Sequence, residues 1–223
     1  LTFISGDLTT NGLLREYELA SEKVSMIEGK KAIVPGNHDE WNLGYKLFPE
    51  FFGKTDFIHY YGKLTVVGLA TSEPDKDDGR LGRSRHGLIR RGLRKKNNLT
   101  LIGFHHHLVP IPNSGREHNI IEDAGETLDI ILRHDIPLVL MGHRHVPYGV
   151  KIHNTLLVNA GTFSCNRTRG HFGNTFNIID IENNSILVTV MNVEKEKQEK
   201  MIQFNCSDGC CINRYYEYDK KID

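Results

Sequence analysis

Short apolar runs that end at Gly, Pro or Asp alternate with amphipathic stretches along the first part of the chain. Residues 1–5 form a mainly apolar run that stops at Gly6-Asp7, and residues 13–28 carry apolar side chains at roughly helical spacing. Residues 31–35 and the aromatic-rich residues 40–52 repeat this order of strand, loop and helix. The pattern predicts two successive strand-helix units.

The middle of the chain continues the alternation. Aromatic and β-branched residues flank Gly62-Lys63, which predicts a hairpin formed by residues 57–61 and 64–70. The next expected elements, in chain order, are a helix at 88–96, a strand at 99–104, a helix at 122–134 and a buried strand at 137–141.

After Gly142 the pattern changes, because short runs follow one another without a helix between them. They predict antiparallel strands at 150–152, 156–159, 175–181 and 186–191. The charge run at 194–200 is expected to form a solvated helix face. The whole pattern predicts a mixed α/β protein with two sheets.

Composition narrows the class of protein. The 28 basic and 28 acidic residues balance, which removes the usual electrostatic argument for a generic nucleic-acid or acidic-membrane binder. No apolar stretch approaches the roughly 18 residues that a membrane span needs, so no membrane partner is expected. Four cysteines are too few for a disulfide framework in 223 residues, which favours a reducing, cytoplasmic setting.

The residues with the clearest chemistry follow four of the expected strands. They are Asp7, the run Asn37-His38-Asp39, the run His105-His106-His107, and the pair His143 and His145. Each alone has an ordinary interpretation as a turn, a helix cap or a solvated loop residue. If the strands are parallel, all four groups meet at one sheet edge, where ligands of open α/β sheets gather. A carboxylate, an amide oxygen and imidazoles suit borderline divalent ions such as Mn²⁺, Fe²⁺ or Zn²⁺.

In their order, these blocks resemble the signature of the calcineurin-like metallophosphoesterase family. The matching blocks are Gly6-Asp7, Gly36-Asn37-His38-Asp39, His105 and Gly142-His143-Arg144-His145, spanning residues 6–145. The resemblance implies a four-layer αββα sandwich and two divalent metal ions that supply a metal-bound hydroxide for phosphoester hydrolysis. It places the domain at residues 1–200, with a cysteine-containing tail at 201–223.

The resemblance also implies individual roles. Asp7 would bridge two metals, Asn37, His105 and His143 would complete one site, and His145 would bind the other metal. His38 would serve as an acid or phosphate-contacting group, oriented by Asp39, although Asp39 can equally cap the next helix.

Several assignments stay open at this stage. Spacing along a strand does not decide which of the three consecutive histidines binds metal, and only the resemblance favours His105. His106 and His107 would line the site or support its ligands. Arg116, Arg167 and Arg169 lie near the blocks and would either hold phosphoryl oxygens or remain surface charges. Cys206, Cys210 and Cys211 have a spacing more typical of tail thiols than of a zinc site.

One departure from the family pattern matters. The family's first block, Asp-x-His after a strand, is absent, so the expected sandwich lacks its N-terminal strand and the metal at His145 lacks two ligands. We therefore expect a longer native polypeptide that supplies them, and at least one metal in this chain. The favoured substrate is a small phosphodiester or cyclic nucleotide, because the histidine-rich block resembles that of small cyclic-nucleotide and glycerophosphodiester hydrolases. The alternatives are a metal-free interaction scaffold on the same fold and a nuclease.

Overall fold

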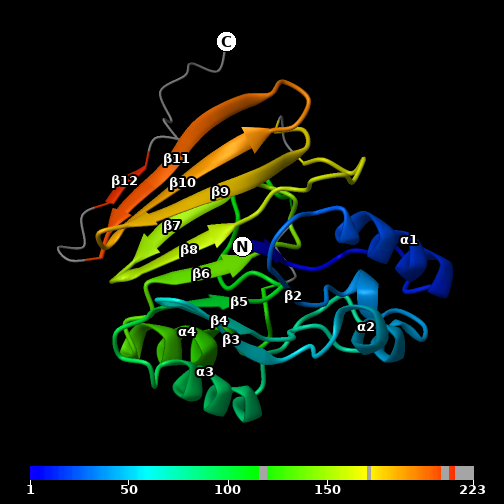
Figure 1. Ribbon diagram of the computed structural model, residues 1–223, viewed down its shortest axis with the longest axis horizontal. Helices are drawn as coiled ribbons and strands as arrows, with labels where there is room; N and C mark the ends of the chain where they lie inside the picture. The colour runs from blue at the N-terminus through cyan, green and yellow to red at the C-terminus, as the bar shows by residue number, and fades with distance from the viewer. Residues whose placement is uncertain (116–119, 170–171, 207–210, 214–223) are drawn as a thin grey trace.

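The computed structural model describes residues 1–115, 120–169, 172–206 and 211–213, and it arranges them in four layers (Figure 1). Two helices cover one face of a six-stranded sheet, and a second β layer packs against the other face. Two further helices cover part of that second layer. This is the αββα arrangement expected from the sequence.

The six-stranded sheet has the order β3-β4-β5-β6-β8-β7. Its strands are β3 (Phe57–Tyr61), β4 (Leu64–Gly68), β5 (Leu99–Gly103), β6 (Leu138–Met141), β7 (Tyr148–Ile152) and β8 (Thr155–Asn159). β4, β5, β6 and β8 run parallel, whereas β3 and β7 are antiparallel edge strands. The carboxyl ends of four strands therefore lie along one edge, where the chain can place polar groups side by side.

Helices α3 (His86–Gly92) and α4 (Ala124–Arg133) cover the outer face of this sheet. The alternating side chains of the strands explain this packing. Val67, Ile102 and Val139 point toward the helices and pack with Ile89 and Ile131. Their immediate neighbours on the same strands point the other way, into the space between the two β layers.

The second β layer consists of two separate sheets within the described chain. β1 (Thr2–Ile4) pairs in parallel with β2 (Lys31–Ile33). The antiparallel strands of the other sheet are β9 (Thr175–Glu182), β10 (Ser185–Asn192), β11 (Lys197–Asn205) and β12 (Cys211–Asn213). The main core lies between the layers, where Val66, Leu101 and Leu138 meet Val188 and Phe204.

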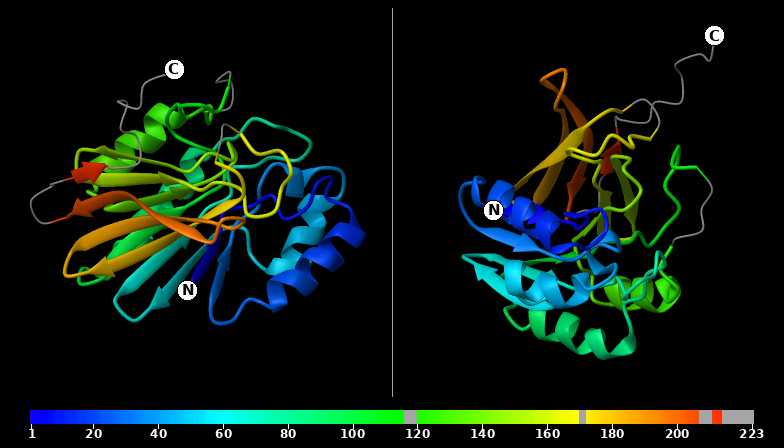
Figure 2. Two further views of the ribbon diagram at one scale, coloured as in Figure 1. Left: turned by 90° about the horizontal axis from the view of Figure 1, so that it is seen from above. Right: turned by 90° about the vertical axis from the view of Figure 1, so that its right-hand side faces the viewer.

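Helices α1 (Leu14–Ser25) and α2 (Gly44–Phe52) lie side by side on the flank formed by β1 and β2 (Figure 2). Tyr17, Val24 and Phe48 are the buried residues that join them to Ile33. A short 3-10 turn, η1 (His38–Glu40), connects β2 to α2, and a second one, η2 (Arg83–Arg85), precedes α3. The strand-helix order expected from the first 52 residues is therefore observed.

Two expectations for the C-terminal region differ from the structure. The charged stretch 194–200 is not a helix, because it forms a turn and the start of β11. The expected boundary at residue 200 falls inside that strand, and Met201, Ile202 and Phe204 are buried in the main core. The side chains of residues 197–200 are exposed, so their charge reflects an exposed part of a strand that then enters the core. None of the described helices combines the length and apolar character that a membrane crossing requires.

Candidate metal centre

Four strand-end loops meet at one edge of the β layers. Parallel pairing of β1 with β2 brings the loop of Asp7 beside that of Asn37, and the Val34 N–H continues the ladder to the Ile4 carbonyl at 3.1 Å. Parallel pairing of β5 with β6 does the same for His105 and His143. The predicted convergence of these groups on one edge is therefore present in the structure.

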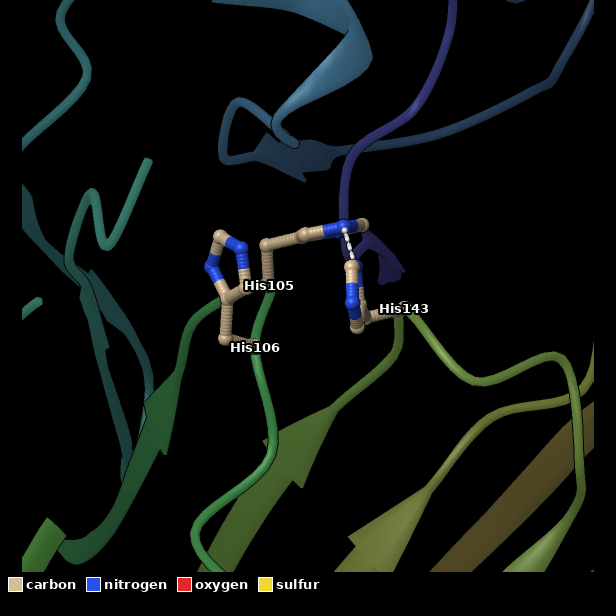
Figure 3. Close-up of side chains that lie close together, drawn as sticks. All are labelled: His105, His106 and His143. Carbon is tan, nitrogen blue, oxygen red and sulfur yellow. Dashed lines mark hydrogen bonds between the residues drawn. The ribbon is translucent and has the colours of Figure 1, made fainter. Parts of the chain in front are cut away.

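The four side chains place their donor atoms in one small cluster. The Nε2 atom of His105 lies 3.1 Å from the Oδ1 of Asn37, 3.1 Å from the Nδ1 of His143 and 3.3 Å from the Oδ2 of Asp7. The Nδ1 of His143 is also 3.1 Å from Asn37 Oδ1. Figure 3 shows the ring of His105 directed at that of His143. We call Asp7, Asn37, His105 and His143 the donor cluster.

Hydrogen bonds with groups outside the donor cluster orient two of its members, His105 and Asn37. The Nδ1 of His105 lies 2.6 Å from the Ser5 carbonyl, to which only a protonated nitrogen can donate, so in the neutral imidazole Nε2 faces the cluster as an acceptor. The amide nitrogen of Asn37 donates to the Asp77 carboxylate at 3.1 Å, which turns Oδ1 toward the histidines. Both groups are therefore held in the orientation that a metal ligand needs.

The backbone at the site is strained, and close packing maintains this strain. Asp7, His143 and His145 have φ angles of 58°, 69° and 55°, a left-handed conformation that costs a non-glycine residue about 1–2 kcal/mol. Gly36 has no side chain where the Asp7 carboxylate lies, and a Cβ there would collide with it. Such strain persists when the surrounding structure enforces it, and it is frequent at functional sites.

Burial and neighbouring charges set the protonation of the donor cluster. Burial raises the pKa of Asp7, but the nearby His105 outweighs it and the pKa falls to about 2. Burial disfavours the charged form of His105, yet the Asp7 carboxylate reverses this and raises its pKa. Burial, reinforced by the three neighbouring histidines, holds the pKa of His143 well below its usual range. A neutral imidazole is the form that binds metals.

His106 lies beside the donor cluster, with a ring nitrogen within 4.8 Å of nitrogens of His105 and His143 (Figure 3). Its Nε2 lies 3.0 Å from the Asp77 carbonyl and its Nδ1 lies 2.9 Å from the Thr71 hydroxyl, so both ring nitrogens are engaged. Burial lowers its pKa to about 3. His107 is fully buried and its ring stacks with that of His143 at 5.9 Å. Both residues therefore support the site by packing against His143.

The side chains of His38 and Asp39 bind different partners in the structure. The Nδ1 of His38 lies 2.8 Å from the Thr10 carbonyl, and its backbone N–H donates to Asp7 Oδ1 at 3.1 Å. The Asp39 carboxylate accepts from the Thr9 N–H and hydroxyl and from the Gly36 N–H at 2.8–3.0 Å. Asp39 thus links the first two loops, whereas the Thr10 carbonyl, and not Asp39, orients the His38 ring. Burial raises the pKa of Asp39 to about 6.

His145 lies beside the donor cluster. Its Nδ1 is 2.9 Å from the Arg167 carbonyl, which requires a proton on Nδ1 and makes Nε2 the available ligand atom. Burial lowers its pKa, and the charge of Asp7 acts in the opposite direction. The main-chain contact shows that the loop of residues 161–169, which follows β8, reaches this edge.

The residues that orient the site were not predicted from the sequence. The carbonyls of Ser5, Thr10 and Arg167 act through the main chain, which no residue type reveals. Asp77 is one of several acidic residues in an exposed loop, and only the structure separates it from Asp75 and Asp78. Arg116 and Cys210, whose roles the sequence left open, lie outside the described residues.

The donor cluster fits a divalent cation. Atoms about 2.1 Å from one ion lie about 3.0–3.4 Å from one another in octahedral or tetrahedral geometry, which matches the observed separations. Asn37 Oδ1, Asp7 Oδ2 and the Nε2 of a neutral His105 are all acceptors, and they repel one another unless a positive charge lies between them. One cation satisfies them together.

The sequence profile of the calcineurin-like phosphoesterases matches residues 1–147, and the chain belongs to this family. Membership implies divalent metal ions, in agreement with the geometry of the donor cluster.

Two curated relatives are similar over this region. A probable cyclic nucleotide phosphodiesterase from Vesicomyosocius okutanii is 27% identical over 147 residues, covering 64% of this chain and 60% of the relative. A probable glycerophosphodiester phosphodiesterase from Arcobacter nitrofigilis is 28% identical over 155 residues, covering 65% and 56% respectively. The chain thus spans less than two thirds of the length of these relatives.

Solved structures support the same fold. A purple acid phosphatase from yellow lupin seeds superposes with a TM-score of 0.61 at 17% identity, covering 95% of this chain and 45% of that one. GAP50, described as the anchor in the inner membrane complex of Plasmodium, gives 0.62 at 13% identity and covers 89% and 75%. At these identities the comparison establishes the sandwich architecture alone.

Proposed function

We propose that the protein is a metal-dependent phosphodiesterase. The observation that carries the proposal is the convergence of four donor atoms, of which those of Asp7, Asn37 and His143 lie 3.1–3.3 Å from the fourth, His105 Nε2. An interaction scaffold without metals has no need for this set of oriented and strained ligands. The intact donor cluster therefore favours the enzyme.

Asp7, Asn37, His105 and His143 would hold one divalent ion, and Asp7 with His145 would contribute to a second. Bound there, such ions supply Lewis-acid polarisation of a phosphoryl oxygen and lower the pKa of a coordinated water. The mixed oxygen and nitrogen donors suit Mn²⁺, Fe²⁺ or Zn²⁺, and we propose manganese as the first ion to test.

His38 would donate a proton to the leaving oxygen. Because its Nδ1–H is fixed on the Thr10 carbonyl, Nε2 is the nitrogen that can face a substrate. Its backbone N–H binds the carboxylate of Asp7, so the ring is attached directly to the metal-ligand loop. An imidazole N–H that faces the substrate is the kind of group that serves as a general acid.

The names of the relatives support a phosphodiester substrate over a monoester. Both a cyclic-nucleotide and a glycerophosphodiester hydrolase are among them. We further propose a reducing, cytoplasmic setting, because four cysteines are too few for a disulfide framework in a chain of 223 residues.

Hydrolysis assays with added Mn²⁺ test this function. We expect the chain to hydrolyse bis-p-nitrophenyl phosphate faster than p-nitrophenyl phosphate, and chelation to stop the reaction. Calorimetric titration of Mn²⁺ into the chelator-treated chain should show binding. An absence of both binding and hydrolysis with Mn²⁺, Fe²⁺ and Zn²⁺ would instead support a scaffold.

A further inference from the structure

The loop of residues 161–169 carries an exposed arginine to the edge of the candidate metal centre. The carbonyl of Arg167 accepts the Nδ1–H of His145 at 2.9 Å, which fixes the loop against a ligand residue. Two positions further on, the side chain of Arg169 is exposed, and its NH1 donates to the Ser114 carbonyl at 2.6 Å. Arg169 is therefore anchored within the same group of loops.

A second guanidinium shares this anchor. Arg144, between His143 and His145 in the sequence, is buried and donates from its NH2 to the same Ser114 carbonyl at 2.7 Å. Two positive charges thus meet on one neutral acceptor. Within the described part of the chain, the Ser114 carbonyl is the one hydrogen-bond or ion-pair partner of Arg169. Because Arg169 forms no ion pair within the described part of the chain, its charge contributes a local positive potential that attracts an anion.

The remaining donors of Arg169 match the chemistry of a phosphoryl group. A guanidinium has five N–H donors in a planar fork, and the observed hydrogen bond uses one nitrogen of that fork. The fork can hold two oxygens of one phosphate, a geometry that a lysine ammonium does not reproduce. The charge of Arg169 also contributes to the lowered pKa of His145, as expected for a neighbour of this ligand.

We propose that Arg169 binds the non-bridging phosphoryl oxygens of the substrate, with the Ser114 carbonyl, to which Arg144 also donates, holding it in place. This inference rests on the proposed phosphodiesterase function and adds a substrate-binding residue to it. Arg169 lies on the side of the centre that carries His145, whereas His38 is attached to the Asp7 loop. The substrate phosphate is then held by the arginine on one side and protonated at its leaving oxygen on the other.

Kinetics of Arg169→Ala test the proposal. We expect kcat/KM for bis-p-nitrophenyl phosphate to fall roughly 10- to 100-fold, mainly through KM, as for the loss of a hydrogen bond to a charged group. Arg169→Lys should recover only part of this loss, because it restores the charge but not the fork. Arg94→Ala, another exposed arginine on the chain segment after α3, is the matched control and should retain the wild-type value.

Binding of inorganic phosphate provides a readout that does not depend on turnover. Calorimetry on the Mn²⁺-loaded chain should show phosphate affinity reduced by a similar factor in Arg169→Ala, and unchanged Mn²⁺ affinity. Reduced Mn²⁺ affinity would instead assign Arg169 a role in holding the His145 loop and overturn the proposal. Unchanged phosphate affinity and kcat/KM would also overturn it. An inactive wild-type chain that still binds phosphate through Arg169 would contradict the proposed function alone.

Discussion

The donor cluster and the polar groups around it are built differently. In the donor cluster, side chains from four loops contact one another, and His105 and Asn37 are almost fully buried. His38, His145 and Arg169 surround it, and each is held by a single main-chain carbonyl: that of Thr10, Arg167 or Ser114. We call these three the rim groups.

This difference indicates that the donor cluster and the rim groups have different functions. Mutually oriented donors that are largely buried suit a tightly held ion. A side chain anchored at one end and exposed at the other can engage a substrate that enters and leaves. The comparison therefore predicts that changes in the donor cluster remove metal, whereas changes at His38 or Arg169 alter turnover or substrate binding with metal retained.

The largest effect is expected from His143→Ala. This substitution removes one of four donors from a cluster whose other members then face a cavity, so stoichiometric Mn²⁺ binding and hydrolysis should both be lost. Metal analysis of the purified variant after dialysis measures this. His134→Ala, at an exposed position after α4, serves as the control. Full metal content in His143→Ala would show that this histidine is not a ligand.

His38→Ala should reduce turnover and spare the metal. Loss of a general acid typically slows a reaction by roughly 10²–10⁴-fold, and the effect is greatest for a poor leaving group. Comparing a diester that releases p-nitrophenolate with one that releases an aliphatic alcohol measures this dependence. Equal losses on both substrates would contradict proton donation, and a loss of Mn²⁺ would move His38 into the donor cluster.

A smaller effect is expected at Asp77, which contacts the donor cluster from outside. Its carboxylate fixes the amide of Asn37, and groups that orient metal ligands typically contribute a factor of about 10–100 in metal affinity. Calorimetric titration of Asp77→Ala with Mn²⁺ measures this factor. Asp78→Ala changes the adjacent exposed carboxylate and should match the wild type. Equal affinities for the two variants would show that Asn37 needs no external support.

The sequence predicted the donor cluster better than its surroundings for a physical reason. The ligand residues follow strands, and the parallel pairing of those strands brings their side chains together. The groups that orient the ligand residues could not be predicted in this way, because any residue type supplies a main-chain carbonyl such as that of Ser5. Asp39 illustrates the limit: its place after His38 suggested a contact, but an η1 turn directs its carboxylate to Thr9 and Gly36.

The C-terminal sheet shows a second limit. Charge alone predicted a helix at residues 194–200, but an antiparallel partner decides the structure of this segment. Lys197 pairs with Asn192 and Ser185 pairs with Asn205, so β10 provides a template along its whole length. Tertiary pairing of this kind overrides local composition. The apolar residues Met201 and Ile202 were the signal that the strand enters the core.

The last and smallest effect is expected at Glu40, which ends the η1 turn that follows Asn37. It is buried, and burial followed by the charge of Asp39 raises its pKa to about 7 from 4.5. The folded state therefore binds more protons than the unfolded state between about pH 4.5 and 7. By linkage, the free energy of unfolding should decline as the pH rises through that interval. Arg85 opposes the shift and limits its size.

Urea unfolding of the metal-free chain from pH 4.5 to 7.5 measures this slope. Glu40→Gln keeps the size of the side chain and removes the titration, so its stability should change less over the same interval than that of the wild type. Glu18→Gln, at an exposed position of α1, should retain the wild-type slope. Parallel curves for wild type and Glu40→Gln would show that Glu40 remains ionised in the folded protein. The loop behind the donor cluster would then hold a buried charge that Arg85 neutralises, and Arg85→Ala should destabilise the fold most strongly at neutral pH.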